Sequence, residues 1–340
     1  MDDTLIRACK GEQAGHTPIW LMRQAGRYIP EYRRLRKEHS MMEICKTPEL
    51  SSAISAMPVA MFGLDAAIIF QDILVPLEAI GIPFRLVDNV GPIIESPLRN
   101  QDGLNMIKEY DPDAVGFVSD AIRSLKDKVG VPVIGFAGGP FTVACYLIEG
   151  MHSGKFTATL RVMKSMPRLW GELMDKLTDM TIRYLNAQAD AGADVLQLFD
   201  TWAGMLGKAD YAAHVNPYVS RIFRSIKMAV PKIHFTLNSS SIIDVIAANG
   251  CDVVGIGWQD GLIDSWSRIK FSKPMQGNLS PHVLAQGGAS LLAEATAMLK
   301  SVGGRRGYIF NLGHGVLPET RPESVRELAE LVHSYRMNTE

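Results

Sequence analysis

A local excess of positive charge is the first sign of chemistry in this sequence. Residues 20–37, WLMRQAGRYIPEYRRLRK, carry six basic side chains and one acid, although the whole chain has a formal net charge of −1. Arg23 and Arg27 directly follow an apolar stretch, and a guanidinium fork matches a carboxylate with two hydrogen bonds. We therefore expect a small anionic ligand here. The four-residue spacing also suits a solvated helix face.

Four further polar residues follow apolar segments, and each has a structural alternative. Asp72 has apolar neighbours and needs a cation or an N–H partner if it is buried, or it caps the next helix. Tyr146 also suits a core aromatic, and Thr201 also suits a helix cap beside Asp200. His314 lies in a Gly-His-Gly turn whose flanking glycines let a ligand approach the backbone, although a lone histidine is often structural.

Several common catalytic motifs are missing from the sequence. We find no HExxH pair, no GxSxG turn and no cluster of cysteine and histidine with metal-ligand spacing. The glycine-rich GFAGGPFT stretch at 135–142 suits an anion at a helix N-terminus but matches neither dinucleotide nor P-loop patterns. The sequence therefore predicts chemistry that needs neither a metal ion nor a seryl nucleophile.

Short apolar runs that alternate with helical patterns must position these residues. Eight such runs predict strands covered on both faces, as in a parallel sheet: residues 18–22, 66–70, 131–136, 193–199, 232–237, 252–257, 273–277 and 307–313. Helical patterns lie between them, including one that begins at Thr47 and Pro48 and one that ends at Gly192. We predict an α/β fold, a single (β/α)8 TIM-type barrel over residues 1–340, with a doubly wound open sheet as the alternative.

Composition narrows the class of protein. The chain has 340 residues, of which 47% are hydrophobic and 21% charged, as in globular proteins. The four cysteines are scattered without a CxxC pair, which favours a reducing compartment, and no signal peptide is visible, so we expect a cytoplasmic protein. No apolar stretch approaches the length of a membrane span, and the balanced charge gives no reason to expect nucleic acid.

Five segments resemble the uroporphyrinogen decarboxylase family. PIWLMRQAGRYIPEYR and GFAGGPFTVACYLIEG are similar to its two signature segments, and DAAIIFQDILVPLEAIG, LQLFDTWAG and GYIFNLGHGVLPETRPESV agree in the family's order. The resemblance implies a barrel that forms a homodimer and needs no cofactor. It implies that the substrate is uroporphyrinogen, whose four acetate side chains become methyls to give coproporphyrinogen in tetrapyrrole (haem or chlorophyll) biosynthesis.

The resemblance also implies roles for residues of this chain. Arg23, Asp72 and Tyr146 are implied to be catalytic. The implied substrate-binding set consists of Arg23, Gln24, Ala25, Gly26, Arg27, Arg36, Asp72, Tyr146, Phe199, Thr201 and His314. Asp72 is implied to face the pyrrole N–H groups, and the arginines to hold the carboxylates. Ser280 and Gly257 depart from positions where the family often has aspartate, which leaves local geometry open but not the reaction class.

The residue types suit decarboxylation without a cofactor. A protonated pyrrole can itself accept the electron pair that carbon dioxide leaves behind, and an ionised Asp72 would stabilise that cation. Arg23 is expected to donate the proton or to organise its donor. Two rivals remain: a zinc-dependent corrinoid or thiol methyltransferase, disfavoured because Thr236 near His234 stands where a cysteine ligand is wanted, and a barrel that binds tetrapyrroles without catalysis.

Overall fold

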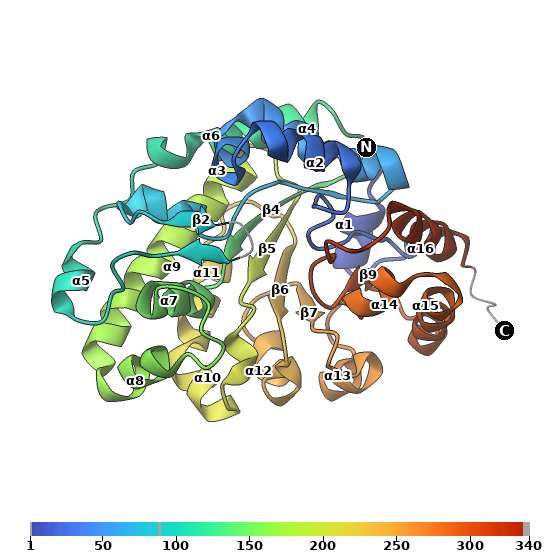
Figure 1. Cartoon of the computed structure of the whole chain (residues 1–340). Coiled ribbons are helices and arrows are strands. Elements are labelled where there is room, and N and C mark those ends of the chain that lie inside the picture. Colours follow the sequence, from blue (N-terminus) through green and yellow to red (C-terminus); the bar gives the residue numbers. More distant parts are fainter. Residues whose placement is uncertain (1, 88–89, 336–340) are drawn as a thin grey trace.

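A parallel sheet forms the centre of the molecule, as seen in the computed structural model of the chain, which describes residues 2–87 and 90–335. Seven strands pair in the order β1-β4-β5-β6-β7-β8-β9, and every pairing is parallel. Their bounds are β1 Ala67–Ile68, β4 Val133–Gly138, β5 Val195–Phe199, β6 Lys232–Thr236, β7 Val253–Ile256, β8 Met275–Leu279 and β9 Tyr308–Leu312. The sheet curls, with helices around its outside (Figure 1).

The predicted strand at 18–22 closes this sheet without becoming a regular strand. Ile19 forms an isolated parallel bridge with Phe310 of β9, and the N–H of Phe310 donates to the carbonyl of Pro18 at 2.9 Å. On its other side, the carbonyl of Ile19 accepts from the N–H of Asp65, just before β1, at 2.9 Å. The segment therefore links the last strand to the first, and the predicted TIM-type barrel is confirmed.

The other seven predicted strands all appear, with shifts of at most two residues at their ends. β1 is the shortest, and this leaves backbone groups of β4 without a strand partner. The buried amide of Gln188 replaces that partner, because it accepts from the N–H of Phe136 and donates to the carbonyl of Phe136, each at 2.8 Å. The polar side chain thus satisfies buried backbone groups that cannot be left unpaired.

Helices cover the barrel and connect its strands. The α-helices are α1 Thr4–Cys9, α2 Pro30–Glu38, α3 Met41–Lys46, α4 Pro48–Phe62, α5 Gln101–Asn105, α6 Gly116–Lys126, α7 Pro140–Glu149, α8 Thr157–Ser165, α9 Pro167–Asp190, α10 Lys208–His214, α11 Asn216–Arg224, α12 Ile243–Ala247, α13 Leu262–Arg268, α14 Pro281–Gln286, α15 Gly288–Val302 and α16 Pro322–Ser334. The 3-10 helices are η1 Val75–Ile80, η2 Asp113–Val115, η3 Ala203–Met205 and η4 Ser239–Ser241.

Sequence signals explain where several helices begin and end. α4 starts at Pro48 after Thr47, as predicted, although the Thr47 side chain makes no capping hydrogen bond. The helix stops at Gly63, whose φ of 68° suits a residue without a side chain.

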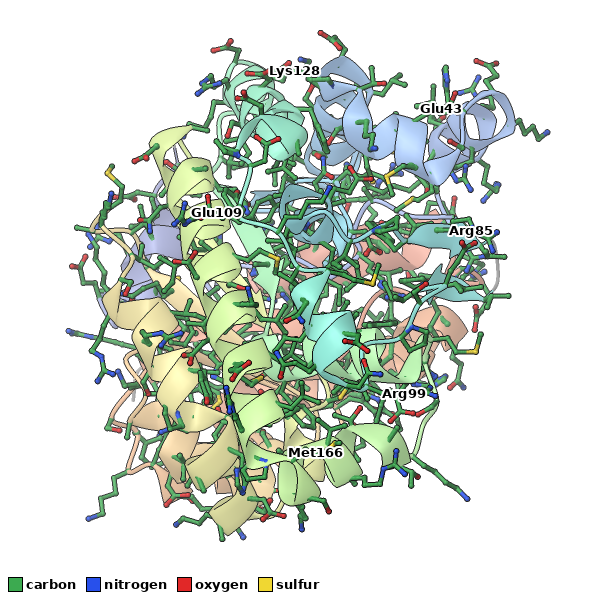
Figure 2. All side chains as sticks on the ribbon, turned by 90° about the vertical axis from the view of Figure 1, so that its left-hand side faces the viewer. Glu43, Arg85, Arg99, Glu109, Lys128 and Met166 are labelled. Carbon is green, nitrogen blue, oxygen red and sulfur yellow. The ribbon has the colours of Figure 1, made fainter. Side chains whose placement is uncertain are left out.

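The long helix α9 packs on β4 and β5. Figure 2 shows α9 from the outside, with charged residues such as Glu43, Arg85 and Lys128 at the periphery.

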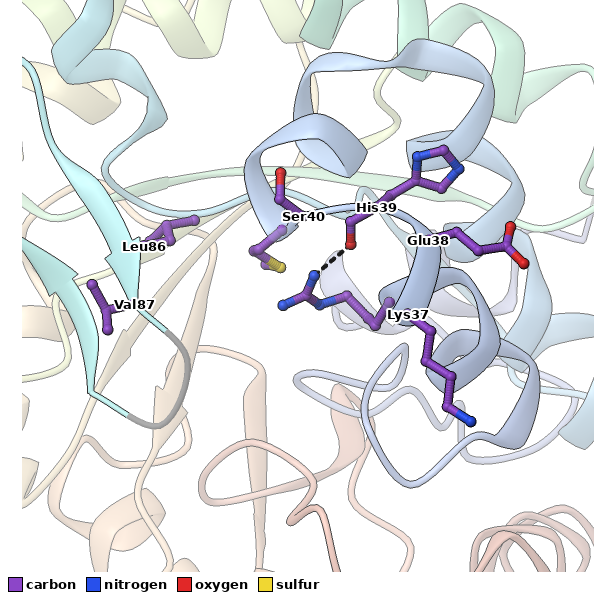
Figure 3. Close-up of a pocket in the computed structure, with 8 residues that line it drawn as sticks. Lys37, Glu38, His39, Ser40, Leu86 and Val87 are labelled. Atoms are coloured by element: carbon purple, nitrogen blue, oxygen red, sulfur yellow. Dashed lines mark hydrogen bonds between the residues drawn. The ribbon is translucent and has the colours of Figure 1, made fainter.

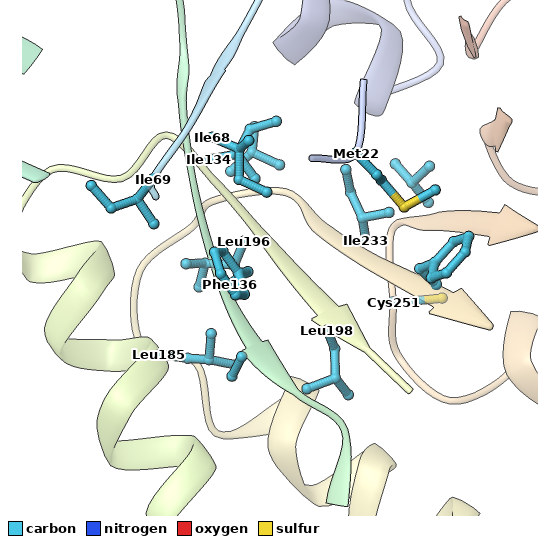
Figure 4. Packing of buried hydrophobic residues seen from close by; sticks show 14 of the residues in the cluster. Met22, Ile68, Ile69, Ile134, Phe136, Leu185, Leu196, Leu198, Ile233 and Cys251 are labelled. Atoms are coloured by element: carbon cyan, nitrogen blue, oxygen red, sulfur yellow. The ribbon is translucent and has the colours of Figure 1, made fainter. Parts of the chain in front are cut away.

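Apolar side chains of neighbouring strands fill the space between sheet and helices. Leu196 pairs in register with Gly135 and points to the helix-covered face of the sheet, whereas Ile68 and Ile134 pair with each other and point to the opposite face (Figure 4). The interior of the barrel also holds a polar chain, in which the indole N–H of Trp20 donates to Gln276 at 2.9 Å and the Gln276 amide donates to Gln197 at 3.0 Å. These two hydrogen bonds connect the segment at 18–22 with β8, and β8 with β5, through the interior of the barrel.

Two further findings concern a small second sheet and the apolar character of the helices. A short antiparallel hairpin of β2 Arg85–Val87 and β3 Gly91–Ile93, which the apolar patterns did not predict, lies outside the main sheet. Within the described residues, no helix combines the length and the apolar character that crossing a lipid bilayer requires.

Candidate active site

A strained turn carries the first predicted site residue, Arg23. The N–H of Gln24 donates to the carbonyl of Leu21 at 3.0 Å, which closes a turn with Arg23 at its third position. Arg23 has a φ of 58°, in the left-handed region that side chains other than glycine and asparagine seldom adopt. Strain of this kind persists only where the surroundings impose it, and it concentrates at functional sites.

The Gly-His-Gly turn after β9 imposes this conformation from the opposite side. The side-chain oxygen of Asn311 accepts from the N–H of Met22 at 3.0 Å, and the N–H of Val316 donates to the carbonyl of Met22 at 2.8 Å. A β-carbon on Gly315 would lie 2.8 Å from Cγ and 3.1 Å from Cβ of Arg23. Gly315 is therefore glycine because the arginine side chain lies directly against it.

Two serines of helix α4 fix the backbone that leads to Asp72. Ser51 donates to the carbonyl of Phe70 at 2.8 Å, and the N–H of Phe70 donates to Ser55 at 2.8 Å, so the chain leaves β1 on a fixed path. The Asp72 carboxylate then accepts from the N–H of Leu74 at 2.9 Å, just before η1. This bond forms a local turn before η1 and not a helix cap, since the N-cap residue of η1 is Leu74 and no side chain caps it. It leaves most of the carboxylate's hydrogen-bonding capacity for other groups.

Electrostatics connect Asp72 with two other predicted residues, Arg23 and Tyr146. Burial raises the pKa of Asp72, and the nearby charge of Arg23 opposes this shift. Burial also raises the pKa of the Tyr146 hydroxyl; the charge of Asp72 adds to that shift and Arg23 counteracts it. The charge of Arg23 also acts on His314. Arg23, Asp72, Tyr146 and His314, which we call the strand-end group, therefore follow four different strands, and the other three are each close enough to Arg23 to be affected by its charge.

Tyr146 reaches this group from helix α7, which starts at Pro140 after the glycine-rich turn. Its ring packs against that of Trp202, with ring centroids 4.6 Å apart. Trp202 in turn lies against Phe156 at 4.4 Å and His152 at 5.3 Å. This aromatic cluster fixes the ring of Tyr146. Because burial raises the pKa of its hydroxyl, that group remains a protonated hydrogen-bond donor under neutral conditions.

His314 is a neutral imidazole with a defined tautomer. The N–H of Gly315 donates to Nδ1 at 2.8 Å, so the ring proton lies on Nε2. Burial, together with the smaller effects of the charges of Arg23 and His282, lowers the pKa of His314 to about 4. At neutral pH this histidine can therefore donate one hydrogen bond to an anionic group without itself carrying charge.

The residues between the two arginines build the loop. The side chain of Gln24 is fully buried, accepts from the N–H of Leu21 at 3.1 Å and donates to the carbonyl of Ala66 at 2.9 Å. Its side chain thus supports the turn from inside. Ala25 and Gly26 are half-buried, and a β-carbon on Gly26 would lie 3.2 Å from the Arg23 carbonyl.

Arg27 and Arg36 lie around Tyr32 rather than in the strand-end group. Both charges lower the pKa of the Tyr32 hydroxyl, against the larger effect of burial, which raises it. Arg36 donates to the carbonyl of His39 at 2.6 Å and lines an open pocket of about 460 Å³ between α2, α3 and the strand β2 (Figure 3). Residues 36–41 form one wall of this pocket, and Leu86 and Val87 form the other.

Phe199 and Thr201 flank a buried acid at the end of β5. The ring of Phe199 lies 5.4 Å from that of Phe136, and Thr201 is half-buried. Between them, Asp200 is fully buried and accepts from the N–H and hydroxyl of Thr142 at 3.1 and 3.0 Å. Burial raises the pKa of Asp200 to about 6, and its second carboxylate oxygen lacks a partner among the described residues.

Sequence patterns missed several neighbours of the strand-end group. Trp202 supports Tyr146, and Trp258, which is 38% exposed, packs on His282 with ring centroids 5.6 Å apart. The N–H of Trp258 also donates to the carbonyl of Gly313, beside His314, at 3.3 Å. Trp202, Trp258 and His282 follow β5, β7 and β8 within three residues, and this position could have identified them as neighbours of the site.

The two departures from the family pattern have structural roles. Ser280 caps α14 by accepting from the N–H of His282 at 3.3 Å. A β-carbon on Gly257 would lie 2.9 Å from a methyl of Leu237, so the present backbone position leaves little space for a side chain.

The residues at the position of the rival zinc site do not fit a catalytic metal. His234 is fully buried on the outside of β6, where its ring contacts Phe223 of α11 and its Nδ1 lies 2.9 Å from Asn249. Thr236 is also buried and offers only a hydroxyl. Neither forms part of a cluster of metal-binding side chains within the described residues.

Comparisons with known proteins agree on one family. A family model described as uroporphyrinogen decarboxylase (URO-D) matches residues 1–335. Relatives named uroporphyrinogen decarboxylase include one from Sorangium cellulosum, 43% identical over 98% of this chain and 97% of its own, and one from Thermus thermophilus, 43% identical over 98% of both. A methyltransferase structure from Methanosarcina mazei shares the fold, with a TM-score of 0.79 and 23% identity over 97% of both chains.

Proposed function

The chain belongs to the uroporphyrinogen decarboxylase family, and we infer from its strand-end group that it converts uroporphyrinogen to coproporphyrinogen in tetrapyrrole biosynthesis. Each of the four acetate side chains loses carbon dioxide and gains a proton, which leaves a methyl group. The observation that carries this inference is the meeting of Arg23, Asp72, Tyr146 and His314 from four strand ends.

Protonation of a pyrrole carbon starts the reaction we propose. The ring becomes cationic and draws the electron pair of the breaking carbon–carbon bond into itself as carbon dioxide leaves. A proton then adds to the exocyclic carbon to form the methyl, and the ring proton is released. Each acetate therefore consumes one proton overall and needs no external electron acceptor.

Asp72 stabilises the cationic ring in this mechanism. Burial raises the pKa of Asp72 because it disfavours the charged form. Pyrrole N–H groups and a developing cation would favour the ionised carboxylate, so the interaction strengthens as the transition state forms. Arg23 donates the proton or organises its donor, and its place beside Asp72 supports this role.

The remaining polar groups hold the substrate's carboxylates. Arg23 and Arg27 are exposed at the loop and suit bidentate contacts. Tyr146 and the Nε2–H of His314 each supply one directed hydrogen bond. Arg36 offers a further cationic contact from the pocket between α2 and β2, while Phe199 and Thr201 contact the ring from β5.

We also make proposals on the oligomeric state of the chain and on its location in the cell. We propose one domain that assembles as a homodimer, and Met205 and Trp258, apolar and 40% and 38% exposed near strand ends, support an interface there. Light scattering at micromolar concentration would report the assembly. A cytoplasmic location is supported by the four cysteines, all buried and unpaired.

A turnover assay tests the proposed reaction. Purified chain is treated with a chelator, supplied with uroporphyrinogen without metal or cofactor, and followed by release of carbon dioxide and formation of coproporphyrinogen. We expect sustained turnover. Tight binding without carbon dioxide would instead support a tetrapyrrole-binding barrel, and activity that returns only with stoichiometric zinc would support the methyltransferase chemistry.

A further inference from the structure

A second cluster of polar side chains lies at the other end of the barrel, where the strands begin. Among the described residues, His16, Asp65 and His333 are the group of three whose ligand atoms could hold a metal ion, and these atoms lie within 4.8 Å of one another. We call them the floor cluster. Asp65 precedes β1 and His16 precedes the segment around Ile19, so the floor cluster and the strand-end group lie at opposite strand ends.

The contacts of the floor cluster are short and converge on one carboxylate. Nε2 of His16 lies 2.9 Å from Oδ1 of Asp65, and Nε2 of His333 lies 2.9 Å from Oδ2. The two imidazoles meet edge to face, with ring centroids 4.7 Å apart. Asp65 is nearly fully buried and is fixed further by the N–H of Ile19 at 2.7 Å, while His16 and His333 remain partly exposed.

We propose that the floor cluster is a binding site for one divalent transition-metal ion, with zinc as its best-fitting occupant. Two imidazole nitrogens and a carboxylate oxygen are ligands that zinc accepts, at bonds of about 2.0–2.2 Å. The present ligand distances require small rotations of the two rings toward each other, and their partial exposure permits such movement. The exposed side leaves coordination positions for water.

Local charge and position favour such an ion. Asp65 is the main source of negative charge beside the two histidines, and the charge of Asp2 adds a smaller effect on His333. The ligands come from three segments: the chain before the first barrel segment, the start of β1 and the end of α16. A bound ion would therefore join the two ends of the chain to the closure of the barrel, as a structural site distinct from the reaction.

Metal binding to tag-free protein tests this proposal without relying on turnover. After removal of metal by chelation, zinc is titrated in a calorimeter, and cobalt is added in a parallel sample whose visible absorption reports coordination geometry. We expect one ion per chain, a tetrahedral or five-coordinate cobalt spectrum, and a rise in melting temperature of about 2 °C or more with zinc.

Glutamine variants separate metal binding from folding. His16→Gln and His333→Gln keep an N–H donor for Asp65 but supply a poor zinc ligand, so each should weaken zinc binding at least tenfold and remove the thermal shift. His214→Gln, outside the cluster, should bind zinc as the wild type does.

Zinc binding that is equal in the wild type, His16→Gln and His333→Gln would overturn the site, as would no uptake by the wild type. If either glutamine variant fails to fold, the wild type still decides, because cobalt that is not retained and keeps the spectrum of the free aqueous ion contradicts coordination by the floor cluster. Turnover of the chelator-treated enzyme tests the proposed function separately, since a structural ion at the floor does not enter the reaction.

Discussion

Asp65 and Asp72 lie at opposite ends of the same strand, β1, and the structure treats them differently. Asp65 receives three donors, from Ile19, His16 and His333. In the part of the chain that the structure describes, Asp72 receives one hydrogen bond, from Leu74, and has Arg23 nearby. A carboxylate with its acceptor capacity filled can hold segments together, whereas one with spare capacity can respond to a ligand. Barrels commonly divide stability and chemistry between these two ends.

Removing the charge of Asp72 should produce the largest effect. Asp72→Asn keeps the shape and the bond from Leu74 but cannot balance a cationic ring. We expect kcat to fall roughly 10²–10³-fold, as when another enzyme loses a preorganised electrostatic group, while the melting temperature stays near that of the wild type. Initial rates with uroporphyrinogen and calorimetric unfolding measure both. A fully active Asp72→Asn enzyme would remove Asp72 from the mechanism.

The equivalent change at the other end of β1, Asp65→Asn, should lower stability and leave turnover unchanged. Asp65→Asn places an amide N–H where N–H donors converge, and we expect the free energy of unfolding to fall by about 2–3 kcal/mol. Chemical denaturation measures this loss. The folded fraction should keep near-wild-type turnover, and a catalytic defect without loss of stability would contradict the division of roles between the two aspartates.

Asp200 sharpens the comparison, because it is buried like Asp65 but lacks a partner on one oxygen. Burial raises its pKa from 3.8 to about 6. Between these values the folded state keeps a proton that the unfolded state has lost, so this group's contribution to unfolding free energy falls as pH rises, by up to about 3 kcal/mol.

Asp200→Asn cannot titrate and should lack this contribution. The difference in unfolding free energy, wild type minus variant, should therefore decrease between about pH 4 and pH 6.5 in denaturation experiments across that range. His314 titrates with the opposite sign in both proteins and cancels in the difference. A difference that is constant with pH would show that Asp200 titrates alike in the folded and unfolded states, which contradicts the raised pKa.

The smallest expected effect separates backbone strain from chemistry at Arg23. Arg23→Gly and Arg23→Ala both remove the guanidinium and should lose activity equally. Glycine adopts the observed φ of 58° without strain, so Arg23→Gly should be more stable than Arg23→Ala by about 1 kcal/mol. Matched denaturation curves measure this difference, and equal stability would mean that the turn relaxes when the arginine is lost.

Apolar runs and their polar ends predicted much of the fold and of the candidate site. The run at 66–70 predicted β1, and the residue types after such runs pointed to Asp72, Tyr146 and His314. These signals are local in sequence, because strand alternation and strand-end positions act over a few residues. The segment at 18–22 was recognised for the same reason, although it pairs mainly through Ile19.

Other features depend on contacts between distant residues. The floor cluster combines residues 16, 65 and 333, so no ligand spacing in the sequence reveals it. Gln24 resembles a binding residue by position, yet the carbonyl of Ala66 and the N–H of Leu21 engage its side chain. The left-handed conformation of Arg23 likewise follows from the turn opposite it and not from its own residue type.

The close packing of Arg23 on Gly315 has a consequence for reading genetic variation in such enzymes. A methyl group at position 315 would collide with the stem of the arginine rather than with its flexible tip. Inherited or laboratory replacements there would therefore mimic the loss of a reactive group, although glycine itself has no functional side chain. A loss of activity on replacement of Gly315 would therefore reflect displacement of Arg23.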